Sequence, residues 1–249
     1  MEFSITKRQW NISKADLKAF CSQKIERTLN AFNQASSGSF YMADYYHNQF
    51  IIDPSHALIL CGYSKALADE KGFAFFGKIL KKDEFRWILQ MNSATYKFLF
   101  NLPINQRTKA MVSYDLTFIM SDGNEVVLHH KVIPYQLCKN GNVWLGLCHI
   151  SLPSSKLKTE QATIFNSETG ERYSFVDGQF VLLESEPITQ EDRQILNCLT
   201  KGLTDKQICT LLNNIPLGTL KSKKIRLFSK LDVDKSTSAV HKAHLLGII

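Results

Sequence analysis

The last quarter of the chain, residues 188 to 249, contains a dense run of lysines on a helical pattern. Between Leu220 and Lys230 the sequence has five cations and no acid. On a helical wheel of 3.6 residues per turn the leucines of this stretch share one face, and Ser222, Ile225 and Arg226 point away from it. So many like charges repel one another unless an anion lies alongside. The pattern predicts a helix that packs on one side and presents the other to a polyanion.

Four short helices are predicted in this segment, and three of them have start signals. Thr189 precedes an acidic first turn, Thr204 stands three residues before Gln207 in capping-box spacing, and Ser236 precedes the last helix. The third helix, about residues 216 to 231, begins at a proline, which suits the first helical position but leaves the cap without a side-chain acceptor.

A short helix, a turn after Leu212 and a basic amphipathic helix make a helix-turn-helix arrangement, whose second helix enters the major groove of duplex DNA. Further positions agree with one version of it: Ile188-Thr189, Ile195-Leu196, Leu199, Gly202-Leu203-Thr204, Lys206, Ile208, Gly218-Thr219-Leu220-Lys221, Lys230-Leu231, Ala239-Val240 and Leu246-Gly247-Ile248-Ile249. In these residues the segment resembles the LuxR-type (FixJ/NarL) DNA-binding domain.

The segment departs from that family at three places. Asn213-Asn214 is an insertion in the turn, Lys223 stands where a polar residue or histidine is common, and Pro216 replaces the usual serine cap. The resemblance implies base or groove contacts by Lys221, Ser222 and Ile225, phosphate contacts by Thr219, Lys223, Arg226 and Lys206, and a dimer contact by Val240, Ala243 and Leu246 or their neighbours.

Residues 13 to 35 place apolar side chains at helical spacing after Ser13, a candidate cap. We expect one amphipathic helix here. Its apolar stripe either covers its own domain or packs against the next domain or a second copy of the chain.

Residues 39 to 152 predict an α+β domain. Two short aromatic strands come first, then short helical pieces, a helix from about Lys82 to Phe100, and a three-strand meander with turns at Asp122-Gly123 and Asn140-Gly141. In the first meander strand, apolar residues occupy every second position and therefore share one face. This element order resembles a PAS domain, which implies a module for sensing and dimerisation. The residues do not identify its signal.

Residues 153 to 187 are expected to connect the two domains. Pro153-Ser154-Ser155-Lys156 is typical of a linker, and runs at 162–165 and 172–176 flank a turn-forming stretch and predict a small hairpin. The predicted organisation is a helix at 1–38, a PAS-like domain at 39–152, a linker at 153–187 and an all-α helix-turn-helix domain at 188–249.

Composition narrows the class of protein. Of the net charge of +7, residues 188–249 supply ten Lys/Arg against five Asp/Glu, so the basic character lies mainly in the predicted DNA-binding segment. Six cysteines without metal spacing predict reduced, mostly buried thiols. The N-terminus has no signal-peptide core and no apolar run reaches a membrane span, so a soluble, cytoplasmic protein is expected.

The sequence contains no motif typical of an enzyme's active site. The sequence lacks a Walker loop, a dinucleotide fingerprint, zinc spacing and a serine elbow. Five histidines, at positions 47, 56, 129, 130 and 149, are more simply surface or hydrogen-bonded residues than haem or metal ligands. We therefore predict no catalytic residue, no metal and no identified cofactor.

The sequence predicts a transcription regulator that binds operator DNA as a homodimer, with RNA polymerase as a further candidate partner. Two alternatives stay open. One is a signalling adaptor whose PAS-like domain binds another protein while the basic helices contact an acidic partner. The other, ranked lower, is a sigma-factor-like promoter-binding protein, which would need a helical core-binding region upstream.

Overall fold

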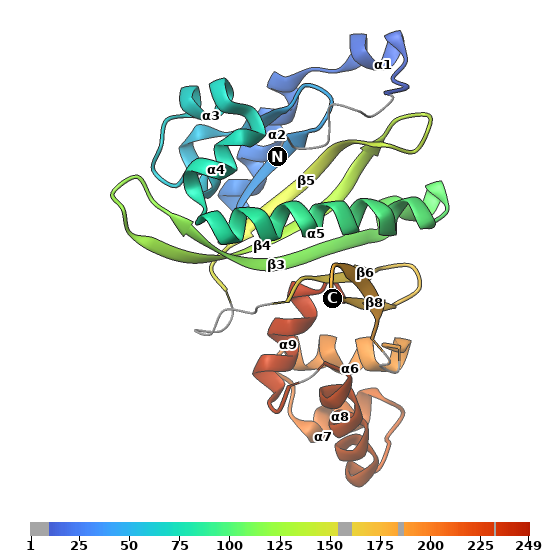
Figure 1. Cartoon of the computed structure of the whole chain (residues 1–249). Coiled ribbons are helices and arrows are strands. Elements are labelled where there is room, and N and C mark those ends of the chain that lie inside the picture. The colour runs from blue at the N-terminus through green and yellow to red at the C-terminus, as the bar shows by residue number, and fades with distance from the viewer. Residues whose placement is uncertain (1–9, 154–160, 184–186, 232) are drawn as a thin grey trace. The chain divides into compact units, whose positions relative to one another are not determined.

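The computed structural model describes residues 10–153, 161–183, 187–231 and 233–249. Two compact units divide the chain (Figure 1). The first unit comprises Met1–Ile164 and Tyr173–Val181, and the second comprises Phe165–Arg172 and Leu182–Ile249.

An eight-stranded sheet, in the order β2-β1-β5-β4-β3-β6-β7-β8, is the centre of the first unit. The pairings of β1 with β2, β1 with β5, β3 with β4 and β4 with β5 are antiparallel. Gly123 and Gly141 have positive φ values of 87° and 79°, as the two predicted hairpin turns require. The strands are β1 (Ser39–Asp44), β2 (Gln49–Ile52), β3 (Ala110–Ile119), β4 (Glu125–Leu137), β5 (Val143–Ser151), β6 (Thr163–Asn166), β7 (Arg172–Val176) and β8 (Gln179–Leu182).

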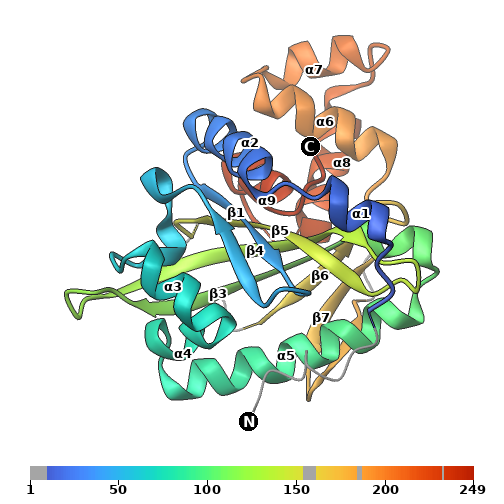
Figure 2. The ribbon, with the colours of Figure 1, turned by 90° about the horizontal axis from the view of Figure 1, so that it is seen from above.

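The helices of the first unit lie around this sheet. The longest, α5 (Lys82–Asn101), runs along the sheet in both views (Figures 1 and 2) and buries Ile88, Met91 and Leu99. The others are α1 (Lys14–Ala19), α2 (Ser22–Ala35), α3 (Lys65–Lys71) and α4 (Phe76–Ile79), with 3-10 turns at Pro54–His56, Leu58–Leu60, Gly72–Phe75 and Ile104–Lys109. No helix among the described residues is long and apolar enough to cross a membrane.

The predicted single helix at residues 13 to 35 is two helices in the structure. Ser13 caps α1 as expected, because its side chain accepts from the Asp16 amide. Phe20 and Cys21 then take extended backbone conformations, and the Phe20 ring packs 5.4 Å from that of Trp144. The break thus turns an aromatic side chain onto the sheet. Because α2 also contacts β1 and β2, the apolar stripe covers its own unit.

Strand β3 has the predicted alternation, but both of its faces are buried from Ala110 to Leu116. The face away from α5 carries polar side chains that pair laterally. Ser113 lies 3.0 Å from the Thr163 hydroxyl of β6, and Asp115 lies 2.6 Å from His129 Nδ1 of β4. The polar half of the alternation is therefore present, but neighbouring strands hydrogen-bond it instead of water.

The connecting region supplies three strands where the sequence predicted two. Besides β6 and β7, the strand β8 follows a turn at Asp177-Gly178, whose φ values of 48° and 81° are both positive. An Asp-Gly pair between apolar runs is a hairpin signal, so this strand could have been found. The expected linker residues 154–156 lie outside the described part of the chain.

Candidate nucleic-acid interface

Four helices make the second unit: α6 (Gln190–Thr200), α7 (Asp205–Leu211), α8 (Leu217–Leu231) and α9 (Ser236–Leu245). Thr189 and Thr204 both form complete capping boxes, with Asp192 and Gln207 as the reciprocal partners. Helix α9 starts at Ser236 as expected, but Lys235 is the cap residue and no side chain caps it. The start signals thus position α6, α7 and α9 to within a residue.

The turn between α7 and α8 contains two left-handed residues in succession. Asn213 and Asn214 have φ values of 59° and 57°, a conformation that asparagine tolerates better than most residues. Helix α8 follows at Leu217, and the Pro216 carbonyl accepts its first hydrogen bond, from the Leu220 amide at 3.1 Å. These two asparagines therefore provide the change of direction between the helices.

Helix α8 has one buried face and one open face. Leu220, Leu227 and Leu231 are fully buried, and α8 packs against α6, α7 and α9. Lys221, Ser222, Ile225, Arg226 and Ser229 are exposed. The last four lie one, four, five and eight residues after Lys221, a spacing that places all five side by side on the outer surface of the helix.

Among the described residues, three lysines of α8 pair with acids of the same unit. The Lys223 amine lies 2.6 Å from Glu191 and the Lys224 amine 2.8 Å from Asp205. The Lys230 amine lies 2.7 Å from Asp192, and both side chains of this pair are less than 10% exposed, at 7% and 9%. The prediction that the cations need an external anion is thus wrong for these three. The acids that pair with them stand in the first turns of α6 and α7.

Asp192 has a second role, because its carboxylate accepts from the Thr189 amide at 2.9 Å. Burial alone would raise the pKa of Asp192, but the hydrogen bonds from Lys230 and Thr189 lower it below its ordinary value. The carboxylate therefore stays charged, and it joins the start of α6 to the end of α8.

The carboxyl end of α8 also receives an arginine that the sequence did not single out. Arg172 is buried, and its Nη1 donates to the Lys230 carbonyl at 2.8 Å. A cation at this end complements the helix dipole and satisfies a terminal carbonyl. The sequence showed Arg172 only as the first residue of the predicted strand at 172–176.

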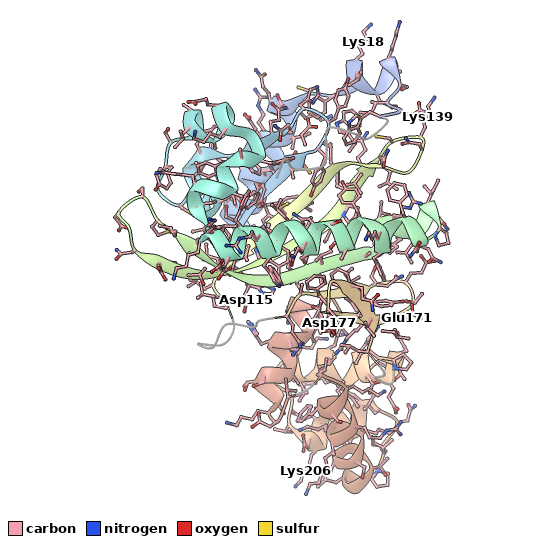
Figure 3. The ribbon with its side chains drawn as sticks, viewed as in Figure 1. Lys18, Asp115, Lys139, Glu171, Asp177 and Lys206 are labelled. Atoms are coloured by element: carbon pink, nitrogen blue, oxygen red, sulfur yellow. The ribbon has the colours of Figure 1, made fainter. Side chains whose placement is uncertain are left out.

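The remaining predicted contact residues lie at different depths. Thr219 and Lys206 are exposed, and Lys206 points outward from the second unit (Figure 3). Val240 is half-buried, whereas Ala243 and Leu246 are 0% and 6% exposed inside this chain. Of the three residues expected in the dimer contact, Val240 alone has an accessible part.

The first unit contains a cavity of about 80 Å³ between α5 and the sheet. Aliphatic, aromatic and a few polar side chains surround it. The lining residues are Tyr45, Leu89, Asn92, Ser93, Thr95, Tyr96, Leu99, Val112, Tyr114, Val132, Pro134, Val143 and Gly146.

Tyr114, which lines this cavity, takes part in a buried hydrogen-bond relay through His130. His130 Nδ1 lies 2.6 Å from the Tyr114 hydroxyl, and Nε2 lies 2.8 Å from the Tyr41 hydroxyl. Burial lowers the pKa of His130 to about 3, with smaller effects from two neighbouring histidines. The imidazole is therefore neutral, and since it donates from one nitrogen and accepts at the other, one tyrosine accepts and the other donates.

The other histidines have structural surroundings. His47 lies 2.6 Å from Asp44, His129 contacts Asp115, and His149 packs on the Phe40 ring. The side chain of His56 lies outside the described residues. Within the described ranges no group of three or more His, Cys, Asp and Glu side chains could hold a metal ion.

Comparisons with known proteins give only distant likenesses. No protein-family model matches this sequence, and neither does any curated protein. Among solved structures, a Vibrio cholerae VqmA dimer without target DNA, from work on LuxR-type receptors, is 14% identical with a TM-score of 0.24 over 56% of each chain. A phage VqmA–DPO complex is 13% identical, with a TM-score of 0.22 over 59% of this chain and 61% of that one.

A third structure, a VqmA–ligand–DNA complex, is 11% identical with a TM-score of 0.24 and matches 64% of this chain and 62% of that one. This chain therefore spans less than two thirds of the length of each of these proteins. At such identities and TM-scores the likenesses carry no argument about function, which has to come from the residues of this chain.

Proposed function

We propose that this protein is a sequence-specific, DNA-binding transcription regulator whose second unit binds duplex DNA through α8. The observation that supports this most directly is the division of α8 into a buried leucine face and an open face with Lys221, Ser222, Ile225 and Arg226. A helix held by its neighbours and presenting mixed cationic, hydroxyl and apolar side chains suits the major groove, where each of these groups has a partner.

In this proposal the exposed residues divide their roles. Lys221, Ser222 and Ile225 contact base edges, while Thr219, Arg226, Lys206 and Lys223 contact phosphates and fix the register. The chain binds as a homodimer through α9, with Val240 and its exposed neighbours in the contact. The order of the four helices and the exposed face of α8 support a LuxR-type class for the second unit.

The first unit acts as a PAS-like sensor. The order of two strands, short helices, one long helix and a three-strand meander supports this class, and the cavity beside α5 supports the sensing of a small molecule. Its volume is about half of the 150 Å³ that admits a benzene ring in an engineered cavity. A larger ligand would have to displace side chains of α5.

Selection of bound duplexes from a random pool by the full-length protein tests the proposal. A consensus with two related half-sites is expected, since a homodimer reads the same sequence twice. Affinity for the selected duplex, a scrambled duplex and heparin should then be measured over one salt series. A regulator keeps its preference for the selected duplex as salt rises, whereas equal binding to all three polyanions would favour the adaptor and refute the proposal.

A further inference from the structure

We infer that Ile225 recognises the C5-methyl group of a thymine in each half-site of the bound DNA. This inference rests on the proposed function and adds the chemical identity of one base contact. It concerns what Ile225, the most exposed apolar side chain of α8, recognises.

The position of Ile225 is the first step. Its side chain is 70% exposed, so it contributes little to the packing of the second unit. A lone exposed apolar residue needs no explanation by itself. Ile225, however, lies at the centre of the open face, with Lys221 and Ser222 one turn before it and Arg226 beside it.

Helix stability does not account for an isoleucine here. A β-branched residue has a lower helix propensity than lysine, alanine or glutamate, because its side chain loses rotamer freedom in a helix. At an exposed position this restriction of the side-chain rotamers favours binding to a partner. Since its χ1 angle is already restricted, little further entropy is lost on contact.

The chemistry of the groove identifies the partner. Isoleucine has no side-chain donor or acceptor, so it cannot pair with the amino, carbonyl or ring-nitrogen groups of base edges. Thymine alone presents an apolar group in the major groove, its C5-methyl. The cations beside Ile225 bring the helix to the phosphates, and the aliphatic side chain then fits a thymine better than any other base.

Replacing thymine with deoxyuridine removes only this methyl group. In the duplex selected by the full-length protein, each thymine should be changed in turn, and the affinity measured by fluorescence anisotropy. We expect a loss of about four-fold at one thymine of each half-site, the ratio that corresponds to the roughly 0.8 kcal/mol of burying one methyl-sized group.

The Ile225→Ala variant should bind the thymine and deoxyuridine duplexes equally at that position while keeping the other preferences of the consensus. Alanine is a stronger helix former, so α8 stays folded, which circular dichroism checks. Ile104→Ala is the matched control, because Ile104 is a 49% exposed isoleucine of the first unit. This control should keep the full sensitivity to deoxyuridine.

Three outcomes separate the inference from the proposed function. If the wild type is indifferent to deoxyuridine at every thymine of its consensus, the inference is wrong and the proposed function stands. If Ile225→Ala keeps the sensitivity, another residue reads the methyl group and the inference is again overturned. If no consensus is selected at all, the proposed function itself fails.

Discussion

The buried ion pair between Asp192 and Lys230 predicts a large loss of stability when Asp192 is changed to asparagine. The Lys230 amine lies 2.7 Å from the carboxylate, and the two side chains are 7% and 9% exposed. Breaking a buried pair by removing one charge costs about 3 to 5 kcal/mol, since the other charge stays buried. Asparagine keeps an acceptor for the Thr189 amide, so we expect the lower value, about 3 kcal/mol.

Hydrogen exchange with mass spectrometry measures this loss in the second unit alone. A loss of about 3 kcal/mol corresponds to a roughly 150-fold faster exchange in those segments of α6 and α8 that exchange through the same opening. The control is Glu191→Gln, which removes a pair whose side chains are 32% and 45% exposed. Exposed pairs contribute about 0.2 to 1 kcal/mol, so exchange should change by less than about five-fold.

The double variant Asp192→Asn with Lys230→Met removes both charges and should recover most of the lost stability. The reasoning is refuted if Asp192→Asn alone behaves like the Glu191 control. The dependence of stability on pH provides a further check, and its direction follows from the pKa of Asp192. Because the folded pKa of Asp192 is below its ordinary value, its contribution is present above about pH 4 and is lost as the pH falls through the folded pKa.

Three further results are expected. Lys221→Ala should weaken binding to the selected duplex by about 1 to 3 kcal/mol. Lys223→Ala should weaken binding to all duplexes alike and reduce the slope of log affinity against log salt by about 1. Fluorescence anisotropy over a salt series measures both effects, and an unchanged slope for Lys223→Ala would contradict its contact with phosphate. His130→Leu leaves two buried tyrosine hydroxyls without their shared partner, so the free energy of unfolding should fall by about 3 kcal/mol. Urea denaturation followed by tryptophan fluorescence measures this loss. A loss below about 1 kcal/mol would refute the relay. Exposed Cys21 should react first with a thiol reagent, and buried Cys148, whose pKa burial raises to about 12, only after unfolding, as peptide mapping would show.

The helical faces of α8 could be predicted because a 3.6-residue period is a local property. The leucines assigned to the packed side are buried, and Ser222, Ile225 and Arg226, assigned to the other side, are exposed. The capping boxes were accessible for the same reason, since each involves residues three positions apart. Short-range geometry therefore fixed the surface of α8 that the proposal uses.

The charge partners of α8 could not be predicted in this way. Glu191 is 32 residues from Lys223, and Asp192 is 38 residues from Lys230. Their pairing depends on how α6 packs across α8, which no period in the sequence encodes. The break of the N-terminal helix at Phe20 has a similar origin, because its contact with Trp144 outweighs a continuous helical pattern.

The internal pairing changes how the basic helix has to work. A run of five cations suggested a general attraction to polyanions, but Glu191, Asp205 and Asp192 offset Lys223, Lys224 and Lys230. Lys224 and Lys230 are too enclosed to reach a phosphate without breaking the unit, since their side chains are 17% and 7% exposed. The more exposed Lys223 can exchange Glu191 for a phosphate, which makes its contribution to affinity smaller than that of a cation with no acid beside it. A helix whose charge is partly neutralised by acids of neighbouring helices binds duplexes of any sequence less tightly. The share of recognition left to Lys221, Ser222 and Ile225 is larger for that reason.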